Sequence, residues 1–380
     1  MANALAARCA VTLVQLRPPN ESIAAADGAG RFERVVALEK DRSYTPSKIL
    51  QGLIGPSPLP VLNYSSPQAA NGLRQLLLEQ PFDGVQVEGI HLLSYLAGIN
   101  ALPQKPAIVV DWHNIESELM RRYAATEANW PKRLAARRTA TLLERAEQRL
   151  LSGAPVHTVA SAREREVLLA RSPRNDIRVI PNGVETSRFL QIIREGPPAA
   201  PKRSLLFVGS MDYHANIDGV TWFARAAWPA IHAAFPDLIF TIVGREPVPE
   251  IRNLASGSVR VTGTVDDVLP YYRDAFAVIV PLRVGGGTRL KILEAMAAGV
   301  PVISTALGAE GIEVTNDTNI LLADDPAQIL SALQRLHRDT DLQRRLAAAG
   351  RLLVAQKYDW DVLGEALYLV HQERIAAARP

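Results

Sequence analysis

Residues 281–302 read PLRVGGGTRLKILEAMAAGVPV, a segment in which a helical pattern follows directly on a glycine-rich loop. The apolar run 277–280 before it is typical of a strand, and residues 289–298 are typical of a helix. Glycines let the backbone approach a ligand closely, and a helix start presents unpaired N–H groups with a partial positive charge. The segment therefore predicts an α/β unit with an anion site for a phosphate or diphosphate.

Charged residues follow the glycines at informative positions. Arg289 and Lys291 add two cations at the predicted anion site. At about 100° per residue, Lys291 and Glu294 share one face of the helix, so a carboxylate lies one turn behind the anion site, where it could accept hydrogen bonds from two ribose hydroxyls. A structural interpretation stays open, in which the glycines only form a flexible turn and Lys291 with Glu294 is a surface pair.

Two common nucleotide-binding motifs are not present in the sequence in complete form. In a Walker A loop, Ser or Thr directly follows the lysine, whereas Ile292 follows Lys291. The dinucleotide fingerprint Gly-x-Gly-x-x-Gly is incomplete at Gly28 and Gly30, which lack a closing glycine. NAD binding is therefore not indicated.

Length and composition bound the class of protein. At about 150 residues per domain, 380 residues predict two domains, and a hydrophobic fraction of 48% suffices for two cores. The net charge of +3 does not favour nucleic-acid binding. The single cysteine, Cys9, excludes an internal disulfide or a cysteine zinc site and suits a reducing compartment.

No apolar run approaches the roughly 18 residues of a membrane span, and residues 1–16 do not resemble a signal peptide, so we expect a cytoplasmic protein.

Strand-like and helical stretches alternate along the whole chain, which predicts parallel sheets covered by helices on both faces. The expected strands are 11–16, 34–38, 60–63, 84–88, 107–112, 156–160, 178–180, 205–208, 238–243, 259–262, 277–280, 301–304 and 320–322. The expected helices are 67–79, 115–123, 132–151, 217–235, 266–274, 289–298, 327–337 and 342–356.

The stretch GPPAAP at residues 196–201 is the best candidate for a linker, because proline and glycine disfavour both helix and sheet. It predicts an N-terminal domain at 1–195 and a C-terminal domain at 203–380, with the last helix packing back on the N-terminal domain. Two such doubly wound domains would face each other across a cleft at the carboxyl ends of their strands.

Several motifs along the chain resemble those of family 4 glycosyltransferases, which have two Rossmann-like domains in the arrangement called GT-B. The most specific is LEAMAAGVPV at 293–302, supported in chain order by IPNGVE at 180–185, FVG at 207–209, IVG at 242–244 and VTGTV at 261–265. The resemblance implies a nucleotide-sugar donor in the C-terminal domain, transfer with retention at the anomeric carbon, and no bound metal or other cofactor.

The resemblance also implies roles for particular residues. Glu294 would hold the ribose, the turn at 263–265 would face the nucleobase, and residues 285–288 would meet the diphosphate or the sugar. The donor-binding candidates are Gly209, Gly263, Thr264, Val265, Gly285, Gly286, Gly287, Thr288 and Glu294.

Two departures from the family pattern concern the charges around the sugar and the diphosphate. Members commonly carry a second glutamate eight positions before the one that matches Glu294, and this position is Gly286 here. Many place Arg and Lys where this chain has Ser210 and Asn216. The leaving diphosphate still needs cations, so Arg289 and Lys291 are the predicted catalytic replacements, with Arg245 as a third candidate.

The first domain offers candidates at its strand ends. His113 follows the strand 107–112, where the resemblance implies a histidine near the transferred sugar and the acceptor; alternatively, it only starts a helix with Asn114 as its N-cap. Glu88 ends the strand 84–88 and is either an acceptor-side residue, together with Asn114, or a solvated carboxylate. Ser161 and Glu164 have the spacing of a capping box.

The stretch 130–151 is strongly basic and includes four leucines, Leu134, Leu142, Leu143 and Leu150. It is either a peripheral contact with the anionic inner face of a membrane or an ordinary solvated helix face.

By the same resemblance, residues 11–16 correspond to the family's second strand. We therefore expect the first domain to lack its opening strand, which is central in a doubly wound sheet, and to leave its neighbours unpaired across a gap. The corresponding hypothesis is that Met1 is a misplaced start or a fragment boundary.

The leading hypothesis is a retaining glycosyltransferase of polysaccharide biosynthesis that moves a sugar to a glycan, lipid-linked or small-molecule acceptor. A catalytically inactive nucleotide-sugar-binding paralogue is the alternative, because of Gly286 and the missing strand. A nucleotide-sugar epimerase of the same architecture is a third hypothesis, which would need further acid–base side chains among only seven histidines.

Overall fold

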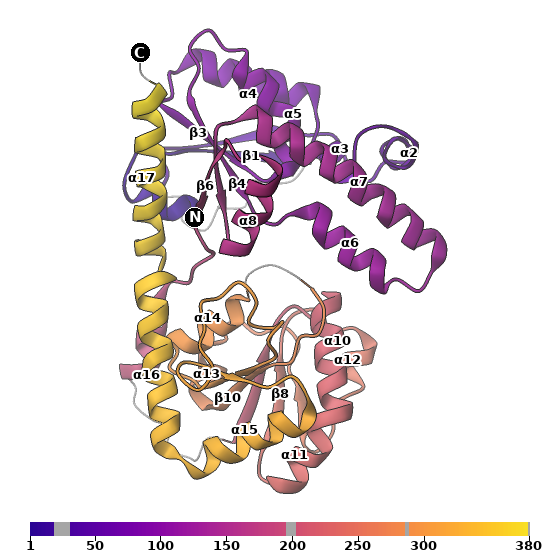
Figure 1. Ribbon diagram of the computed structural model, residues 1–380, viewed down its shortest axis with the longest axis vertical. Coiled ribbons are helices and arrows are strands. Elements are labelled where there is room, and N and C mark those ends of the chain that lie inside the picture. The colour runs from indigo at the N-terminus through magenta and orange to yellow at the C-terminus, as the bar shows by residue number, and fades with distance from the viewer. Residues whose placement is uncertain (19–30, 195–202, 286–288, 379–380) are drawn as a thin grey trace. The chain divides into compact units, whose positions relative to one another are not determined.

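The computed structural model describes residues 1–18, 31–194, 203–285 and 289–378 (Figure 1). The chain forms two compact units, of which unit 1 comprises Met1–Pro181 with Leu363–Pro380 and unit 2 comprises Asn182–Val362. The division lies upstream of the predicted linker 196–201, which is outside the described residues. Val184 forms a bridge with Asp359, which ties the segment after Pro181 to unit 2.

Unit 2 contains one six-stranded sheet in which every pairing is parallel. Its strands are β7 (Ser204–Val208), β8 (Ile239–Val243), β9 (Val259–Val261), β10 (Ala275–Val280), β11 (Val302–Ser304) and β12 (Leu321–Leu322). The order β12-β11-β10-β7-β8-β9 places the first and fourth strands, β7 and β10, side by side at the centre. This is the doubly wound order, and the crevice between these two strands is its topological switch point, where such sheets bind ligands.

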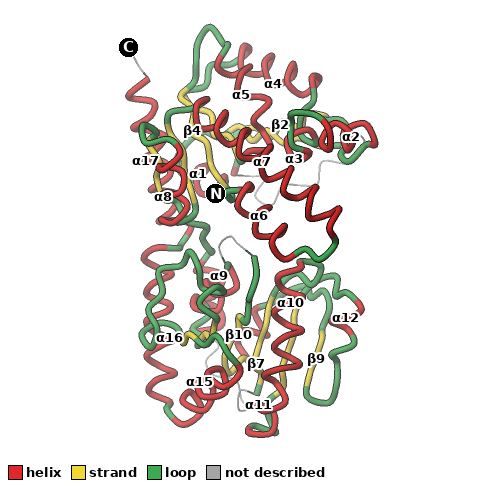
Figure 2. Tube along the Cα trace, turned by 45° about the vertical axis from the view of Figure 1, so that its right-hand side comes forward, coloured by secondary structure: helices red, strands yellow, loops and turns green. Residues whose placement is uncertain are grey.

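Helices cover both faces of this sheet (Figure 2). They are α9 (Thr186–Arg194), α10 (His214–Trp222), α11 (Trp228–Ala234), α12 (Pro249–Arg252), α13 (Leu269–Asp274), α14 (Leu290–Ala297), α15 (Pro326–Arg338) and α16 (Thr340–Lys357). Leu205, Leu206 and Phe207 are completely buried, as expected for a central parallel strand. A π-helical turn, η3 (Phe223–Ala227), joins α10 to α11 without a break.

Unit 1 has two separate parallel sheets. The strands are β1 (Thr12–Arg17), β2 (Arg34–Glu39), β3 (Gly84–Glu88), β4 (Ala107–Trp112), β5 (Val156–Val159) and β6 (Asp176–Val179). β1 pairs with β2, whereas β3, β4, β5 and β6 form a four-stranded sheet in that order. Among the described residues β1 does not pair with this second sheet, so the expected gap in the first domain's sheet is observed.

The helices of unit 1 include a long pair, α6 and α7, that packs closely together. The helices are α1 (Ala2–Ala6), α2 (Pro46–Ile54), α3 (Leu59–Leu62), α4 (Pro67–Glu79), η2 (Ile90–Leu92), α5 (Leu93–Asn100), α6 (Glu116–Thr126), α7 (Trp130–Gly153), α8 (Ala162–Arg171) and α17 (Trp360–Ala378). None of the helices in the described residues is both long and apolar enough to cross a bilayer.

The C-terminal helix α17 contributes to the core of unit 1. Leu367 and Val370 are buried in a cluster with Leu5, Val109 and Val156. An ion pair between Arg8 Nε and Glu365 Oε2 at 2.8 Å joins the beginning of the chain to the same helix.

One predicted strand is wrong, since residues 60–63 fall on the short helix α3. Pro60 lies in the first turn, where a missing N–H has no cost, and Val61 is buried. A run of only four apolar residues fits a strand and a buried helical turn equally well.

The predicted capping box of α8 is confirmed. Ser161 Oγ accepts a hydrogen bond from the Glu164 N–H at 3.3 Å, and Glu164 Oε2 accepts one from the Ala160 N–H at 3.1 Å. This short motif is structural, as the sequence indicated.

Candidate functional site

The switch point of unit 2 is lined by backbone from two loops, one after β7 and one after β10. Gly285 has a φ of +105°, which an L side chain rarely adopts. A Cβ added there would lie 3.0 Å from Ala215 Cβ and 3.4 Å from the Tyr213 hydroxyl. Gly285 therefore keeps the end of β10 in close contact with the start of α10.

A second glycine pair closes the other side of this crevice. A Cβ at Gly244, after β8, would lie 1.7 Å from the Gly209 carbonyl oxygen, and a Cβ at Gly209 would lie 2.9 Å from Lys291 Nζ. Only glycine fits at Gly244, whereas a side chain at Gly209 would displace the ends of the Asn216 and Lys291 side chains. The predicted donor residue Gly209 is thus placed directly against the ammonium group of Lys291.

Lys291 is a half-buried residue that reaches from α14 to the end of β7. Its Nζ donates to Asn216 Oδ1 at 2.7 Å and lies 4.2 Å from the centre of the Phe207 ring. Burial, followed by repulsion from Arg289, lowers the pKa of Lys291 to about 7, although the Glu294 carboxylate opposes the shift. The site therefore holds a lysine that an incoming anion would stabilise in its charged form.

Arg289 lies at the N-terminal end of α14 and is only 6% exposed. A Cβ at Gly285 would come within 3.5 Å of its Nη2, so the guanidinium borders the same glycine backbone. The structure brings together Arg289, Lys291, Gly209 and Gly285, as predicted. The other three residues of the predicted loop, Gly286, Gly287 and Thr288, lie outside the described residues.

Glu294 lies further along α14, where the sequence predicted a carboxylate behind the anion site. Its Oε2 accepts a hydrogen bond from the hydroxyl of Tyr272 at 2.8 Å. Burial raises the pKa of Glu294, opposed by this hydrogen bond and by the charges of Arg188 and Lys291. Tyr272, fully buried on α13, fixes the carboxylate, and no sequence motif had pointed to it.

The predicted base-facing turn borders a cavity of about 540 Å³ in unit 2. Gly263 has a φ of +74°, and its carbonyl accepts a hydrogen bond from the Gly244 N–H at 3.3 Å. Gly263 and Thr264 line the cavity, whereas Val265 packs against the hydrophobic core. Two of the three predicted residues therefore line a space large enough for a small molecule.

Ser210 and Asn216, the two departures from the family pattern, connect the loop after β7 to its surroundings. Asn216 Nδ2 donates to the Ser210 carbonyl at 2.8 Å while its Oδ1 accepts from Lys291. Arg245 Nε donates to Ser210 Oγ at 3.0 Å. The third predicted cation, Arg245, thus lies at this corner, and Asn216 positions the lysine.

In unit 1, Glu88 and His113 meet at the carboxyl ends of β3 and β4. His113 Nε2 donates to Glu88 Oε2 at 2.8 Å. This hydrogen bond is the main cause that raises the pKa of His113. Burial acts to raise the pKa of Glu88, but the hydrogen bonds from His113 and Gln86 outweigh it and leave that pKa lowered. The geometry joins the two predicted residues into one charged pair.

Asp111 completes this group, although no sequence motif singled it out. Its Oδ2 lies 3.6 Å from His113 Nε2, and its Oδ1 accepts from the Thr158 hydroxyl at 2.5 Å. Burial, followed by repulsion from Glu88, raises the pKa of Asp111 to about 6. A buried aspartate at the end of an apolar strand was the signal that could have identified it.

The group Glu88, Asp111 and His113 is also where unit 1 could hold a metal ion. One potential ligand atom from each lies within 4.8 Å of the others, in the only such cluster found among the described residues. The existing hydrogen bond between His113 and Glu88 already accounts for this proximity.

Asn114 does not cap α6, because the N-cap residue is Ile115 and no side chain accepts from the first turn. That structural interpretation is wrong. Instead, the Asn114 side chain hydrogen-bonds to Glu116, which works against the burial that raises the pKa of this carboxyl group.

Models of known protein families match both halves of the chain. A model described as "Glycosyltransferase Family 4" matches residues 1–188, and one described as "Glycosyl transferases group 1" matches residues 202–339.

Individual relatives are more distant. The phosphatidyl-myo-inositol mannosyltransferase of Mycobacterium leprae is 30% identical over 52% of this chain and 54% of its own length. The glycogen synthase of Mycobacterium tuberculosis is 26% identical over 52% of this chain and 48% of its own. The chain thus spans about half the length of the curated relatives it matches.

Among solved structures, the sucrose-phosphate synthase from Thermosynechococcus elongatus superimposes with a TM-score of 0.72 at 20% identity, over 99% of this chain and 92% of that one. This likeness concerns the fold, two Rossmann-like domains of the GT-B type. Taken with the family models that match both halves and with the strand order of unit 2, it identifies the chain as a member of the family 4 glycosyltransferases.

Proposed function

We propose that this chain is a retaining glycosyltransferase that binds a nucleotide-sugar at the switch point of unit 2 and transfers the sugar to an acceptor hydroxyl. The observation that carries the proposal is Lys291, whose ammonium group is desolvated beside Arg289 and lies against the backbone of Gly209. A buried ammonium group without an acidic partner in contact is costly in an apolar core. A diphosphate is the anion that fits two neighbouring cations and the start of a helix.

The two cations have a specific task in the reaction. Transfer breaks the bond between the anomeric carbon and the diphosphate oxygen, and negative charge develops on the departing diphosphate. Cations fixed beforehand at that position stabilise the developing charge without having to reorganise. Arg289 and Lys291 supply this stabilisation in place of the residues that many family members carry at Ser210 and Asn216.

The rest of the donor occupies positions further from the bond that breaks. Glu294, oriented by Tyr272, accepts hydrogen bonds from the ribose hydroxyls. The cavity beside Gly263 and Thr264 takes the nucleobase, with backbone groups of the turn facing it. This arrangement assigns the ribose and the base to separate elements of unit 2.

Unit 1 supplies the acceptor side. His113, charged through its pairing with Glu88, offers its Nδ1–H to the transferred sugar or the acceptor. In the balanced reaction the acceptor oxygen forms the new bond to the anomeric carbon as the bond to the diphosphate breaks, and the departing diphosphate takes the proton of the acceptor hydroxyl.

The acceptor belongs to one of three classes, a glycan, a lipid-linked molecule or a small molecule. The names of the relatives span all three, with glycogen, phosphatidyl-myo-inositol and sucrose phosphate. We also propose that transfer needs no metal, because side-chain cations take the position that a metal would occupy beside the diphosphate.

A transfer assay with the full chain tests the proposal. UDP-, GDP-, ADP- and TDP-sugars are offered with glycan, lipid-linked and soluble acceptors, and the anomeric configuration of the product is read by NMR. We expect one donor to be consumed with retention, and the Lys291→Met variant to be at least tenfold slower. Lys105→Met, which removes an exposed lysine of unit 1, serves as the matched control and should leave the rate unchanged. Inverted product, or full activity in Lys291→Met, would contradict the proposal.

An inactive nucleotide-sugar-binding paralogue is the second candidate, favoured by Gly286 at the position where family members commonly carry a glutamate. It predicts that the full chain binds a nucleotide diphosphate through Lys291 and Glu294 yet neither hydrolyses nor transfers any donor.

A further inference from the structure

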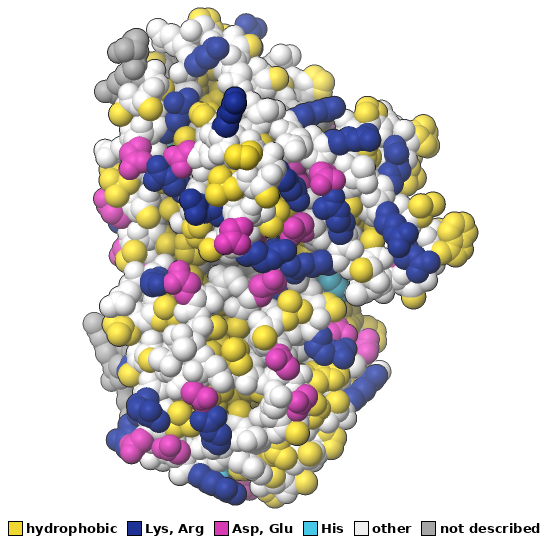
Figure 3. All heavy atoms as spheres, in the orientation of Figure 1, with side chains coloured by type: hydrophobic (Ala, Val, Ile, Leu, Met, Phe, Trp, Pro, Cys, Tyr) yellow, Lys and Arg dark blue, Asp and Glu magenta, His cyan; other side chains and the backbone are white. Residues whose placement is uncertain are grey.

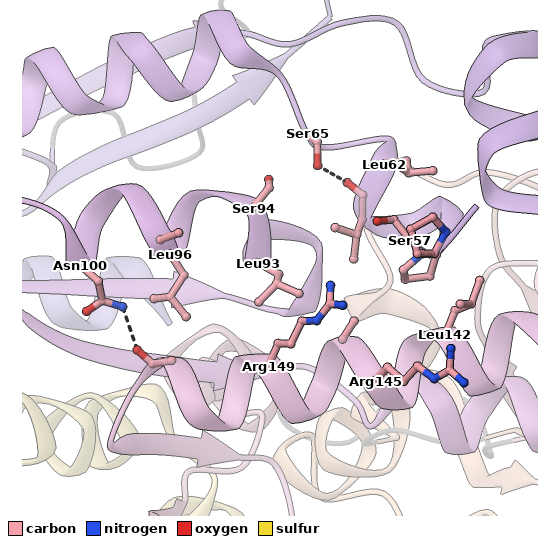
Figure 4. Close-up of a pocket in the computed structure, with 16 residues that line it drawn as sticks. Ser57, Leu62, Ser65, Leu93, Ser94, Leu96, Asn100, Leu142, Arg145 and Arg149 are labelled. Carbon is pink, nitrogen blue, oxygen red and sulfur yellow. Dashed lines mark hydrogen bonds between the residues drawn. The ribbon is translucent and has the colours of Figure 1, made fainter.

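A cavity of about 490 Å³ lies within unit 1, away from the group Glu88, Asp111 and His113 (Figure 4). It is formed by the loop after α2 and by α3, α5 and α7. The walls are largely apolar, with Val61, Leu62, Leu93, Leu96 and Leu142 among the lining residues. Neither the donor site nor the acceptor side described above uses this space.

Two arginines of α7, Arg145 and Arg149, line the cavity (Figure 4). They are four residues apart and therefore lie on one face of the helix. Within the described residues neither guanidinium has a hydrogen bond or an ion pair. The acids of the same helix are already engaged, because Glu144 pairs with Arg121 and Glu147 with Arg171. The cavity thus joins an apolar interior to uncompensated positive charge.

The outer surface beside the cavity is apolar as well. Ile49, Leu50, Leu53 and Ile54 of α2 are 39–74% exposed. The chain runs from this helix directly into Pro56, Ser57 and Pro58, which line the cavity.

Arg138 of α7 holds α2 in this place, donating to the Leu53 carbonyl at 2.5 Å and to the Gly55 carbonyl at 2.7 Å. On the face shown in Figure 3, Lys and Arg side chains form a row across this part of unit 1, and hydrophobic side chains lie beside it. An apolar surface edged with basic residues matches the charge and polarity of an anionic leaflet.

The exposure of the apolar side chains shows which part of the stretch 130–151 could contact a membrane. Leu142, Leu143 and Leu150 are buried at 0–3% exposure, whereas Trp130 and Leu134 are 68% and 62% exposed. The apolar contact surface is therefore provided by α2 and the first turns of α7, and of the four leucines seen in the sequence only Leu134 takes part in it.

We propose that this cavity binds an anionic phospholipid of a bilayer, with the phosphate between Arg145 and Arg149, part of the chain against the leucine walls, and α2 resting in the same leaflet. A free phosphate would leave the apolar walls in water, and a neutral lipid would leave both arginines without a partner. The inference extends the lipid-linked acceptor class of the proposed function, but it concerns binding alone. Its test requires no sugar transfer, so either proposal can fail without the other.

Co-sedimentation of the full chain with vesicles tests the bilayer contact. We expect binding to vesicles of phosphatidylglycerol and phosphatidylcholine but not to phosphatidylcholine alone. Arg145→Glu with Arg149→Glu should weaken that binding by about tenfold or more. The control carries the same charge change at Arg338 and Arg345, two exposed arginines of unit 2, and should weaken it by about threefold at most. Equal losses in both double variants would mean that only the overall charge matters, which would overturn the site.

Calorimetry with a short-chain, monomeric phosphatidylglycerol tests occupancy of the cavity itself. Ala97→Trp places a large side chain in the cavity wall, whereas Gly98→Trp points into open space one residue further on. We expect the first variant to lose the lipid and the second to retain it. Equally tight binding of inorganic phosphate, or lipid binding unchanged in Ala97→Trp, would overturn the proposal. So would binding of an acidic peptide in preference to the lipid.

Discussion

Lys291 is a lysine whose charge is unfavourable in the ligand-free protein. Its pKa of about 7 lies below the ordinary value of 10.5, so between these values the folded chain binds fewer protons than the unfolded chain. The free energy of unfolding contributed by this group therefore rises with pH across that window, and the full cost of the buried charge is present below it. An anion beside the ammonium group would reverse the shift.

This reversal predicts that nucleotide binding takes up protons. At pH 8 we expect the full chain to take up close to one proton, or about 0.9, for each nucleotide diphosphate bound, because Lys291 becomes charged in the complex. Calorimetry in buffers of different ionisation enthalpy measures this number. Lys291→Met should bind more weakly and take up almost none. Uptake that persists in the variant would assign the proton to another group.

Glu294 allows a second prediction at this scale. Glu294→Gln keeps the size of the side chain but removes the charge that strengthens hydrogen bonds to ribose. We expect nucleotide affinity to fall about 10- to 100-fold, as for loss of hydrogen bonds to a charged group worth about 1.5–3 kcal/mol. Isothermal titration gives the value. Glu250→Gln, an identical change on the exposed helix α12, should have no effect, and a 2′-deoxyribose nucleotide should lose less affinity in Glu294→Gln than the ribose form does.

The sequence could group individual site residues where those residues lie close to one another in the chain. Arg289, Lys291 and Glu294 follow one glycine-rich loop within a few positions, so helical geometry alone places them together. Asn216, Tyr272 and Asp111 acquire their roles from partners far along the chain, such as Lys291 for Asn216. No local pattern contains that information.

Among the elements, α14 owes its abrupt end to Gly299. This residue has a φ of +70°, and the Val300 N–H donates to the Ala295 carbonyl at 2.9 Å, as in a Schellman motif. Pro301 then prevents the helix from continuing, and β11 begins at Val302. The Gly-Val-Pro part of the motif is therefore structural, whereas its glutamate faces the site.

Substitution of two glycines tests this interpretation. Gly299→Ala should lower the free energy of unfolding by about 1–2 kcal/mol, because alanine is strained in the left-handed region. Gly98→Ala, in the middle of α5 with open space around it, should instead raise it by about 0.5–1 kcal/mol. Denaturant titration compares the two variants. Opposite signs are expected, and a stabilising Gly299→Ala would contradict the capping role.

Element type was predictable because buried parallel strands are short continuous apolar runs separated by longer amphipathic stretches. The error at residues 60–63 occurred where that contrast vanishes, since a four-residue apolar run has too little length to show a period. The long stretch expected as one regular helix at 217–235 is continuous in the structure but contains the π-helical turn η3. Periodicity averages over such a local irregularity and does not reveal it.

For the molecule as a whole, a bound nucleotide should raise thermal stability without help from a metal. At a concentration 100 times its dissociation constant it adds about 2.7 kcal/mol, which corresponds to about 5–10 °C in Tm for a unit of this size. Differential scanning calorimetry of the full chain with UDP or GDP measures the shift. We expect the same shift and the same transfer rate in EDTA. A loss of both on chelation would point to the group Glu88, Asp111 and His113 as a true metal site.

The two-unit architecture was predicted from length and from the alternation of elements, and the resemblance supplied the order of the motifs. Neither length nor alternation indicates which strands that are distant in sequence pair with each other. The one exception was the gap expected between the first strands and the rest of the first domain's sheet. The order of the strands depends on the direction in which each crossover connection runs across the sheet. The apolar pattern of a strand is nearly the same for either direction, so it does not reveal that order.

The π-helical turn η3 has a consequence for how this chain tolerates changes in length. Phe223 and Trp228 are five residues apart, yet both rings contact Phe240, with centroids 4.7 and 5.6 Å away. In a regular α-helix, at about 100° per residue, those side chains would point in directions about 140° apart. Deleting one residue from 223–227 would convert the turn to regular α-helix, in which the same two rings, then four residues apart, would point only about 40° apart and stay on the core side. The wider turn thus absorbs one extra amino acid without moving Trp228 away from Phe240.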